Sequence, residues 1–167
     1  PWEKSFLKSA LTAENALHTT TQIITFITQL KSVNNLSISK IPLKDMNSWY
    51  LSDDAIYQEE QKYFKVVAVD VEIGNREVIK WQQPMIEPSN EGLCAFVCKE
   101  INDVLHFAVQ AKFECGNYDI IELAPTVQTL TGDYKNTDTI LPFLDYVLSV
   151  QEDKIYFDTL QSEEGGR

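Results

Sequence analysis

The residues of this sequence that are best suited to chemistry lie on one short run near its middle. Gln110, Lys112 and Glu114 alternate there with apolar residues. Residues two apart on a β-strand share a face, so a strand here presents an amide, an ammonium and a carboxylate on one side. That side is either the floor of a pocket that binds and acts on a polar ligand, or a hydrated sheet surface. The pattern alone leaves both interpretations open.

Other polar residues are placed where they could complete such a pocket. Gln83 and Glu87 lie on either side of Pro84 in a run that is otherwise rich in apolar residues. Four more come from turns and the segments that follow them, and each is by itself also a common turn or surface residue. They are Asn117, Thr126, Gln128 and Tyr134.

Three cysteines and two histidines raise the question of a metal site. Structural zinc ligands usually come in close pairs from tight turns, whereas Cys94 and Cys98 are separated by three residues of a predicted strand. We therefore expect no metal, cysteines that are buried as small apolar side chains, and histidines that pack or lie on the surface. The sequence also has no glycine-rich phosphate loop, no G-x-S-x-G and no C-x-x-C. Those absences disfavour nucleotide triphosphate, dinucleotide, acyl-transfer and thiol redox enzymes.

The composition is that of an ordinary globular domain. The 167 residues are 44% apolar and 23% charged, and at this length one domain is the default. A net charge of −11 disfavours a nucleic-acid groove, and no apolar run or leader pattern supports membrane spanning or secretion. The odd cysteine count fits a reducing compartment, so we expect a cytoplasmic protein that binds neither nucleic acid nor membrane.

The hydrophobic patterns predict an α+β domain with a mixed or antiparallel sheet. The Asn102-Asp103 pair predicts a tight hairpin turn, because both residues tolerate positive φ. Helices are predicted over 12–34, over a single turn at 43–49 and in a short segment after Pro142. A short extended piece is predicted over 36–41, and strands are predicted over 63–73 with its hairpin partner 77–82, 93–101, 104–115, 118–123 and 154–160.

The segment from Trp81 to Tyr134 resembles the signature block of the NDP-hexose 2,3-dehydratases of deoxysugar biosynthesis. The family has W-x-Q-P, G-[IL]-L, D-G-V-L-H, Q-A-K-x-E-x-G-N and P-T-V-Q motifs, closed by a tyrosine. With weaker upstream matches, the resemblance covers about 130 residues. The matching positions are Trp81-Gln82-Gln83-Pro84, Gly92-Leu93, Asp103-Val104-Leu105-His106, Gln110-Ala111-Lys112, Glu114, Gly116-Asn117, Pro125-Thr126-Val127-Gln128 and Tyr134.

This resemblance implies a Nudix-like fold, a mixed and largely antiparallel sheet flanked by helices. The implied organisation is an N-terminal helical segment over 1–35 and one 2,3-dehydratase repeat over 36–167, where the family carries two repeats in one chain. An isolated or homodimeric repeat is implied, and we expect a homodimer. The polar residues directly after the last predicted strand indicate a native chain that extends beyond Arg167. The acidic metal-binding helix of Nudix hydrolases is missing, so pyrophosphate hydrolysis is not implied.

The reaction implied by the resemblance is a dehydration of a nucleotide-linked, dTDP-type 4-keto-6-deoxyhexose, which needs no cofactor. The C3 hydrogen lies beside the C4 ketone, so a carboxylate can remove it if a cation stabilises the C4 oxygen. We hypothesise Glu114 or Glu87 as the base, Lys112 as stabiliser of the enolate, and Tyr134 or the second carboxylate as the acid. The hypothetical substrate-binding residues are Arg76, Trp81, Gln83, Gln110, Asn117, Thr126 and Gln128.

Two other interpretations stay open at this point. The chain could be a non-catalytic repeat that binds the nucleotide sugar or forms a dimer, while its counterpart does the chemistry. It could also be a plain structural domain whose polar strand face is only hydrated.

Overall fold

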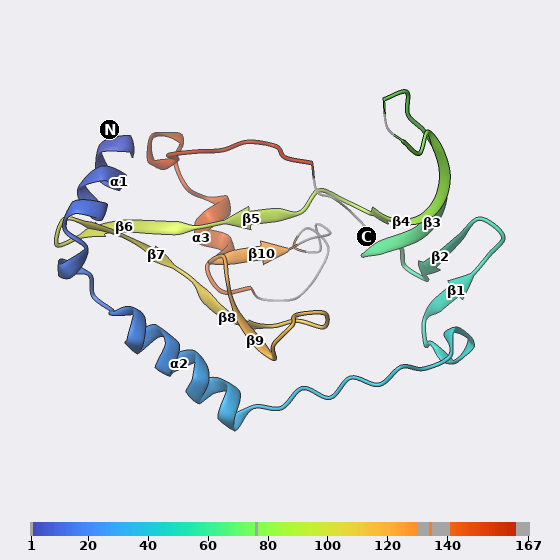
Figure 1. Cartoon of the computed structure of the whole chain (residues 1–167), viewed down its shortest axis with the longest axis horizontal. Coiled ribbons are helices and arrows are strands. Elements are labelled where there is room, and N and C mark those ends of the chain that lie inside the picture. Colours follow the sequence, from blue (N-terminus) through green and yellow to red (C-terminus); the bar gives the residue numbers. More distant parts are fainter. Residues whose placement is uncertain (1, 76, 130–133, 135–140, 163–167) are drawn as a thin grey trace. The chain divides into compact units, whose positions relative to one another are not determined.

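The structure is a computed structural model that describes residues 2–75, 77–129, 134 and 141–162. The chain forms two compact units (Figure 1). The first unit comprises Pro1–Lys40, Cys94–Gln128 and Ile140–Phe157. The second unit comprises Ile41–Leu93, Thr129–Thr139 and Asp158–Arg167.

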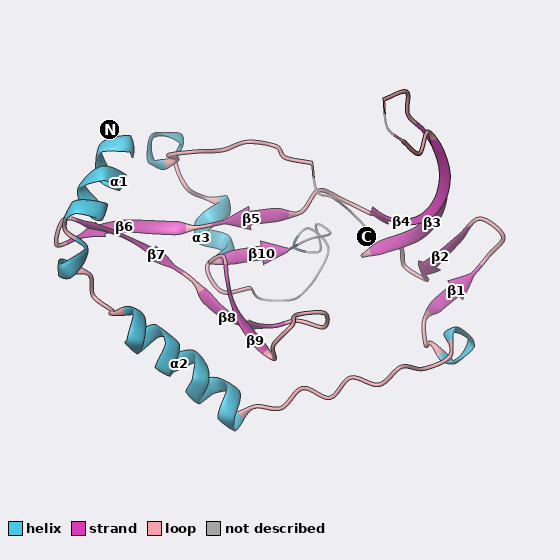
Figure 2. Ribbon diagram, in the orientation of Figure 1, coloured by secondary structure: helices cyan, strands magenta, loops and turns pink. Residues whose placement is uncertain are grey.

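Helices and short strands make up the first unit, and its described strands pair as three two-stranded sheets, β10 with β5, β6 with β7, and β8 with β9 (Figure 2). The helices are α1 (Trp2–Leu11), α2 (Thr20–Val33) and α3 (Leu144–Leu148), with 3₁₀ turns at Ala13–Asn15 and Glu152–Lys154. The strands are β5 (Leu93–Ala95), β6 (Val97–Ile101), β7 (Val104–Ala108), β8 (Gln110–Phe113), β9 (Ile121–Ala124) and β10 (Val127–Thr129).

The predicted helix over 12–34 begins later than expected because a capping box fixes its start. The Thr19 hydroxyl accepts a hydrogen bond from the Gln22 backbone N–H at 3.2 Å, and the Gln22 side chain accepts one from the Thr19 N–H at 2.8 Å. This reciprocal pair satisfies two N–H groups that a helix start leaves unpaired, so the α-helix runs from Thr20. The preceding helix α1 was not among the predicted helices.

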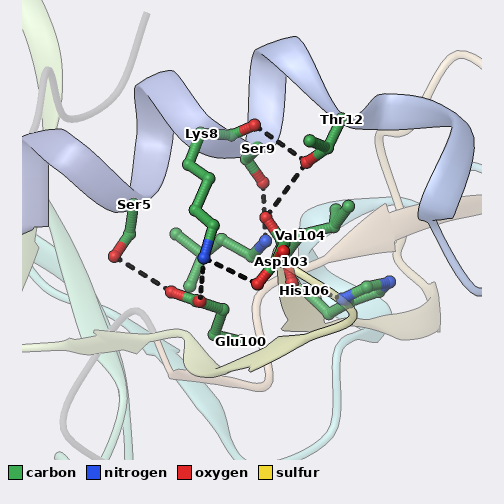
Figure 3. A network of polar contacts seen from close by, with 9 residues as sticks. Ser5, Lys8, Ser9, Thr12, Glu100, Asp103, Val104 and His106 are labelled. Carbon is green, nitrogen blue, oxygen red and sulfur yellow. Dashed lines mark hydrogen bonds and ion pairs between the residues drawn. The ribbon is translucent and has the colours of Figure 1, made fainter.

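The predicted turn at Asn102-Asp103 is confirmed. The two residues have φ of 53° and 68°, the left-handed values that a two-residue hairpin turn requires, and they join β6 to β7. Helix α1 lies along this hairpin (Figure 3). The Lys8 ammonium contacts Asp103 at 2.6 Å and Glu100 at 3.3 Å. Hydrogen bonds to these two carboxylates raise the pKa of Lys8, and the bond to Asp103 has the larger effect.

Two longer strands predicted in this unit are each interrupted. The run 93–101 divides into β5 and β6 at Phe96, and the run 104–115 divides into β7 and β8 at Val109. The predicted strand over 118–123 is observed as β9. Among the described residues, the buried apolar side chains belong to this unit and are Val104, Ile121, Val127 and Leu144.

An antiparallel sheet of order β1-β2-β3-β4 forms the second unit. Strands β3 and β4 confirm the hairpin predicted from 63–73 and 77–82, although β4 extends further along the chain. Register places Trp81 opposite Val71 and Gln83 opposite Val69, so these four side chains share one face. The strands are β1 (Trp49–Leu51), β2 (Ala55–Gln58), β3 (Phe64–Glu72) and β4 (Lys80–Pro88), after a 3₁₀ turn at Leu43–Asp45.

The strand predicted over 154–160 is wrong. Residues 155–160 form no strand, and Tyr156, Phe157 and Leu160 expose 62%, 71% and 80% of their surface. An alternating apolar pattern becomes a strand only where a neighbour pairs with it and buries one face, and these side chains are not buried. Residues 36–41, predicted as a short extended piece, form neither a helix nor a strand.

The architecture of helices and largely antiparallel sheets confirms the α+β class. The Nudix-like character of the fold and the boundary after residue 35 remain predictions. Within the described part of the chain, no helix combines the length and the apolar character that crossing a bilayer requires.

Candidate functional site

Polar side chains gather along β8 and directly after its end in the first unit, and Lys112 contacts two of them. The Lys112 ammonium lies 3.2 Å from Oε1 of Gln128 on β10 and 3.3 Å from a carboxylate oxygen of Glu114. The Lys112 and Glu114 side chains expose 24% and 35% of their surface, so they are largely withdrawn from solvent. We call Gln110, Lys112, Glu114 and Gln128 the Lys112 cluster.

Gln110 ties the start of β8 to the segment before β10. Its side-chain amide donates a hydrogen bond to the Pro125 carbonyl at 3.0 Å. Next to Pro125, the Thr126 hydroxyl accepts a hydrogen bond from the Val97 backbone N–H at 2.9 Å and donates one to the Ala108 carbonyl. Thr126 is 6% exposed, so this hydroxyl is engaged inside the unit.

The turn after β8 is also fixed by local contacts. The Asn117 N–H donates to the Glu114 carbonyl at 3.3 Å, and Gly116 between them has φ of 107°, a value that glycine adopts without steric cost. Lys31 of α2 forms an ion pair with Asp119, and hydrogen bonds from Lys31 and from the Ile120 N–H lower the pKa of Asp119. These contacts hold the loop that carries Glu114 and the half-buried Asn117.

One carboxylate on this face was not among the predicted site residues. Glu122 on β9 lies directly opposite Lys112 in the β8–β9 pairing, so its side chain emerges on the same face. The sequence predicts a strand over 118–123, which includes Glu122. The register of that strand against β8 is not visible in the sequence pattern. The ammonium is thus accompanied on that face by carboxylates at 114 and 122.

The predicted site residues of β4 belong to the second unit. The Trp81 indole N–H donates to Oε1 of Gln83 at 2.7 Å, and Trp81 borders a depression of about 620 Å³ lined also by Asn75, Glu77 and Val78.

Glu87 pairs with Lys65 across the β3–β4 ladder at 2.9 Å. The two residues border a hollow of about 240 Å³ together with Tyr57 and Phe64. Glu87 therefore has its own cation within the second unit.

The structure thus brings six predicted residues together in the first unit and three others in the second. Tyr134 is half-buried and is assigned to the second unit, whereas Arg76 lies outside the described residues. The first-unit residues are Gln110, Lys112, Glu114, Asn117, Thr126 and Gln128. The second-unit residues are Trp81, Gln83 and Glu87.

The cysteines are not the buried side chains that their type suggested. Cys94 and Cys115 are exposed, and Cys98 is half-buried. The expectation is wrong at 94 and 115 because β5 is only three residues long and because β8 ends before Cys115. Burial raises the pKa of the Cys98 thiol, which favours its neutral form.

His106 has a structural role, as expected. Its Nε2 accepts a hydrogen bond from the Leu17 N–H at 3.0 Å, and its Nδ1 lies 2.9 Å from the Val104 carbonyl. An accepting Nε2 leaves the proton on Nδ1, so these contacts assign a neutral tautomer that holds the chain after α1 against β7.

Chemically, the Lys112 cluster combines a proton acceptor with a donor that can stabilise an oxyanion. A carboxylate next to an ammonium in a half-buried setting suits proton removal beside a carbonyl group. Within the second unit by itself, Trp81 and Gln83 pair an aromatic ring with an amide, which suits stacking on a ring and hydrogen bonding to it.

Comparison with known proteins places these features in a family. The sequence pattern of the family NDP-hexose 2,3-dehydratase matches residues 20–167. The chain is 40% identical over 169 residues to a dTDP-4-dehydro-6-deoxy-alpha-D-glucopyranose 2,3-dehydratase of Streptomyces violaceoruber, covering 100% of the chain and 38% of that relative.

Enzymes of the same name from two other organisms are similar. The one from Saccharopolyspora spinosa is 40% identical over 83% of the chain and 29% of its own length, and the one from Amycolatopsis orientalis is 38% identical over 91% and 33%. The chain thus spans about a third of the length of these relatives. It belongs to the NDP-hexose 2,3-dehydratase family.

Proposed function

We propose that this chain is a hydro-lyase repeat that removes water across C2 and C3 of a dTDP-linked 4-keto-6-deoxyhexose in deoxysugar biosynthesis. The observation that carries the proposal is the half-buried contact at 3.3 Å between Lys112 of β8 and Glu114, which follows the end of that strand. Family membership and the names of the relatives support the choice of substrate.

The first step removes the C3 hydrogen as a proton. Its electron pair moves toward C4, so negative charge develops on the C4 oxygen, where the Lys112 ammonium stabilises it by a charge-assisted hydrogen bond. Glu114 is the preferred base because it already contacts Lys112 within the same unit. Glu87, which pairs with Lys65, is the alternative base.

The second step expels the C2 hydroxyl. The electron pair returns from the enolate to form the C2–C3 double bond, and an acid protonates the leaving oxygen so that water departs. Tyr134 is the proposed acid, with the remaining carboxylate as the alternative. The resulting enol tautomerises to a 3,4-diketo-2,6-dideoxy sugar, so the overall change is the loss of one water without oxidation or reduction.

The remaining predicted residues take binding roles in this proposal. Gln110, Asn117 and Gln128 hold sugar hydroxyls and carbonyls. Trp81 stacks on the base or sugar beside Gln83, and Arg76 meets the diphosphate. We further propose a cytoplasmic homodimer, because free thiols suit a reducing compartment and the family resemblance implies a second repeat.

A 1,2-diketone can be trapped, which gives a direct test. The chain is incubated with dTDP-4-keto-6-deoxyglucose and an aromatic 1,2-diamine, which condenses with adjacent carbonyls, and the mixture is analysed by mass spectrometry. We expect the adduct of a sugar that has lost one water. Unchanged substrate would contradict the dehydratase.

The rival function is a repeat that binds the nucleotide sugar without converting it. The observation that favours it is that the chain spans only about a third of its relatives. Calorimetric titration with dTDP separates the two functions. Binding without any trapped diketone supports the rival, and binding with product supports the dehydratase.

A further inference from the structure

Four strands of the first unit meet and change partners at one point. The β6–β7 ladder ends at the pair Val97 and Ala108. Beyond that pair, β5 pairs with β10 instead, and β8 pairs with β9. Strands β8 and β10, which carry three of the four residues of the Lys112 cluster, therefore pair with different partners just beyond the end of the β6–β7 hairpin. We call Val97, Ala108 and Thr126 the fork.

A side chain sits at the apex of the fork. The Thr126 hydroxyl accepts from the Val97 N–H at 2.9 Å and donates to the Ala108 carbonyl, which are groups of the last residue pair in the ladder. In an antiparallel ladder, such groups bond to each other directly at alternate pairs. The Thr126 hydroxyl bonds to both groups, so residue 126 is fixed at the end of the β6–β7 ladder, where the strands change partners.

A second contact fixes the same segment from the other side. Gln110, two residues after Ala108, donates to the carbonyl of Pro125, which immediately precedes Thr126. The backbone of residues 125–126 is thereby tied to β6, to the end of β7 and to the start of β8. Gln128 follows two residues later on β10, and its amide oxygen accepts the Lys112 ammonium at 3.2 Å.

We propose that Thr126 is a positioning residue that sets the place of Gln128 and thereby of the Lys112 ammonium. Its hydroxyl hydrogen is committed to Ala108 and it accepts from Val97, and the side chain is 6% exposed, so these contacts support a positioning role. Thr126 acts through Gln128 and touches no reacting atom. The catalytic part of this inference rests on the proposed function of Lys112, whereas the structural part does not.

Three variants of the full chain test the role. Thr126→Val keeps the shape of the side chain and removes the hydroxyl, and Thr126→Ser keeps the hydroxyl. Thr129→Val is the matched control, because Thr129 lies on β10, the strand that follows Thr126, and its buried hydroxyl has no hydrogen-bond partner in the described part of the chain. The main readout is the ¹Hε–¹³Cε resonance of Lys112, assigned from its loss in Lys112→Met.

We expect Thr126→Val to move the Lys112 resonance and to lower kcat on the order of 10-fold or more. We expect Thr126→Ser and Thr129→Val to stay close to the unmodified chain in both measurements. The positioning role would be overturned if Thr126→Val, like the control Thr129→Val, leaves the Lys112 resonance in place. A moved resonance with unchanged kcat would support positioning and contradict the catalytic role of Lys112.

If Thr126→Val does not fold, amide hydrogen exchange on the unmodified chain decides the question. The proposal requires the Val97 amide to be as protected as the paired amides of β6 and β7. Exchange of Val97 at the rate of an exposed amide would refute the bond on which the fork depends.

Discussion

The indole N–H of Trp81 donates to the side-chain oxygen of Gln83 across 2.7 Å, on one face of an edge strand. This bond orients the ring beside the depression that Asn75, Glu77 and Val78 also line. A ring held in this way can stack on a nucleobase without first losing rotamer freedom.

We therefore predict that dTDP changes the tryptophan fluorescence of the chain and that Trp81→Phe weakens this response. The control is Trp49→Phe, because Trp49 packs on Phe64 at 5.0 Å between ring centroids, away from the nucleotide in our proposal. A response that disappears in the Trp49 variant and persists in the Trp81 variant would place the nucleotide elsewhere.

The Lys31–Asp119 ion pair predicts a loss of stability in acid. Because the pKa of Asp119 in the folded chain lies below its ordinary value of 3.8, the pair stabilises the fold above that pH and the contribution is lost as pH falls through the lowered pKa. The effect is small because both side chains contact water.

The measurement is the difference in Tm between the unmodified chain and Asp119→Asn from pH 2 to pH 6. We expect the difference to be largest near pH 6 and to vanish toward pH 2. A difference that does not depend on pH would mean that the carboxylate charge contributes nothing.

The hairpin turn predicts that position 102 tolerates only residues that adopt a positive φ. Asn102 has φ of 53°, so a β-branched residue there is strained, and Asn102→Val should lower the free energy of unfolding by about 1–2 kcal/mol. Asn102→Gly is the control, since glycine adopts this conformation freely. Urea unfolding measures both, and an equal stability of the two variants would contradict the turn.

Substitutions at two positions of β9 should differ in their effect on the free energy of unfolding. Ile121 is 1% exposed and Leu123, two residues on, is 48% exposed. Ile121→Ala should cost about 2–5 kcal/mol of unfolding free energy, because it leaves a cavity among closely packed side chains. Leu123→Ala should cost much less, and similar losses in the two variants would refute the burial pattern of this strand.

Local features of the fold could be predicted because their causes lie next to each other in the sequence. The Asn102-Asp103 turn and the strand before Gly74 follow from residue types within a few positions, and both are confirmed. The interruptions at Phe96 and Val109 could not be predicted in this way. The hydroxyl that bonds at the end of the ladder between them comes from Thr126, 29 residues after Val97.

In the candidate site, too, the local features could be predicted and the contacts between distant segments could not. The alternation along β8 correctly predicts that Lys112 and Glu114 lie together, because a period of two is a local property. The contact of Lys112 with Gln128 depends on how β8 and β10 approach each other, and the position of Glu122 depends on strand register. Neither is visible before the pairing of the strands is known.

The central claim is that the Lys112 cluster carries out the dehydration, and the rate of diketone formation with Lys112→Met and Glu114→Gln tests it most directly. Lys99→Met is the matched control, since Lys99 is an exposed lysine of β6 in the same unit. We predict that each cluster variant turns over dTDP-4-keto-6-deoxyglucose about 10²-fold more slowly, or slower still, while Lys99→Met matches the unmodified chain. Equal rates in all four proteins would contradict the account.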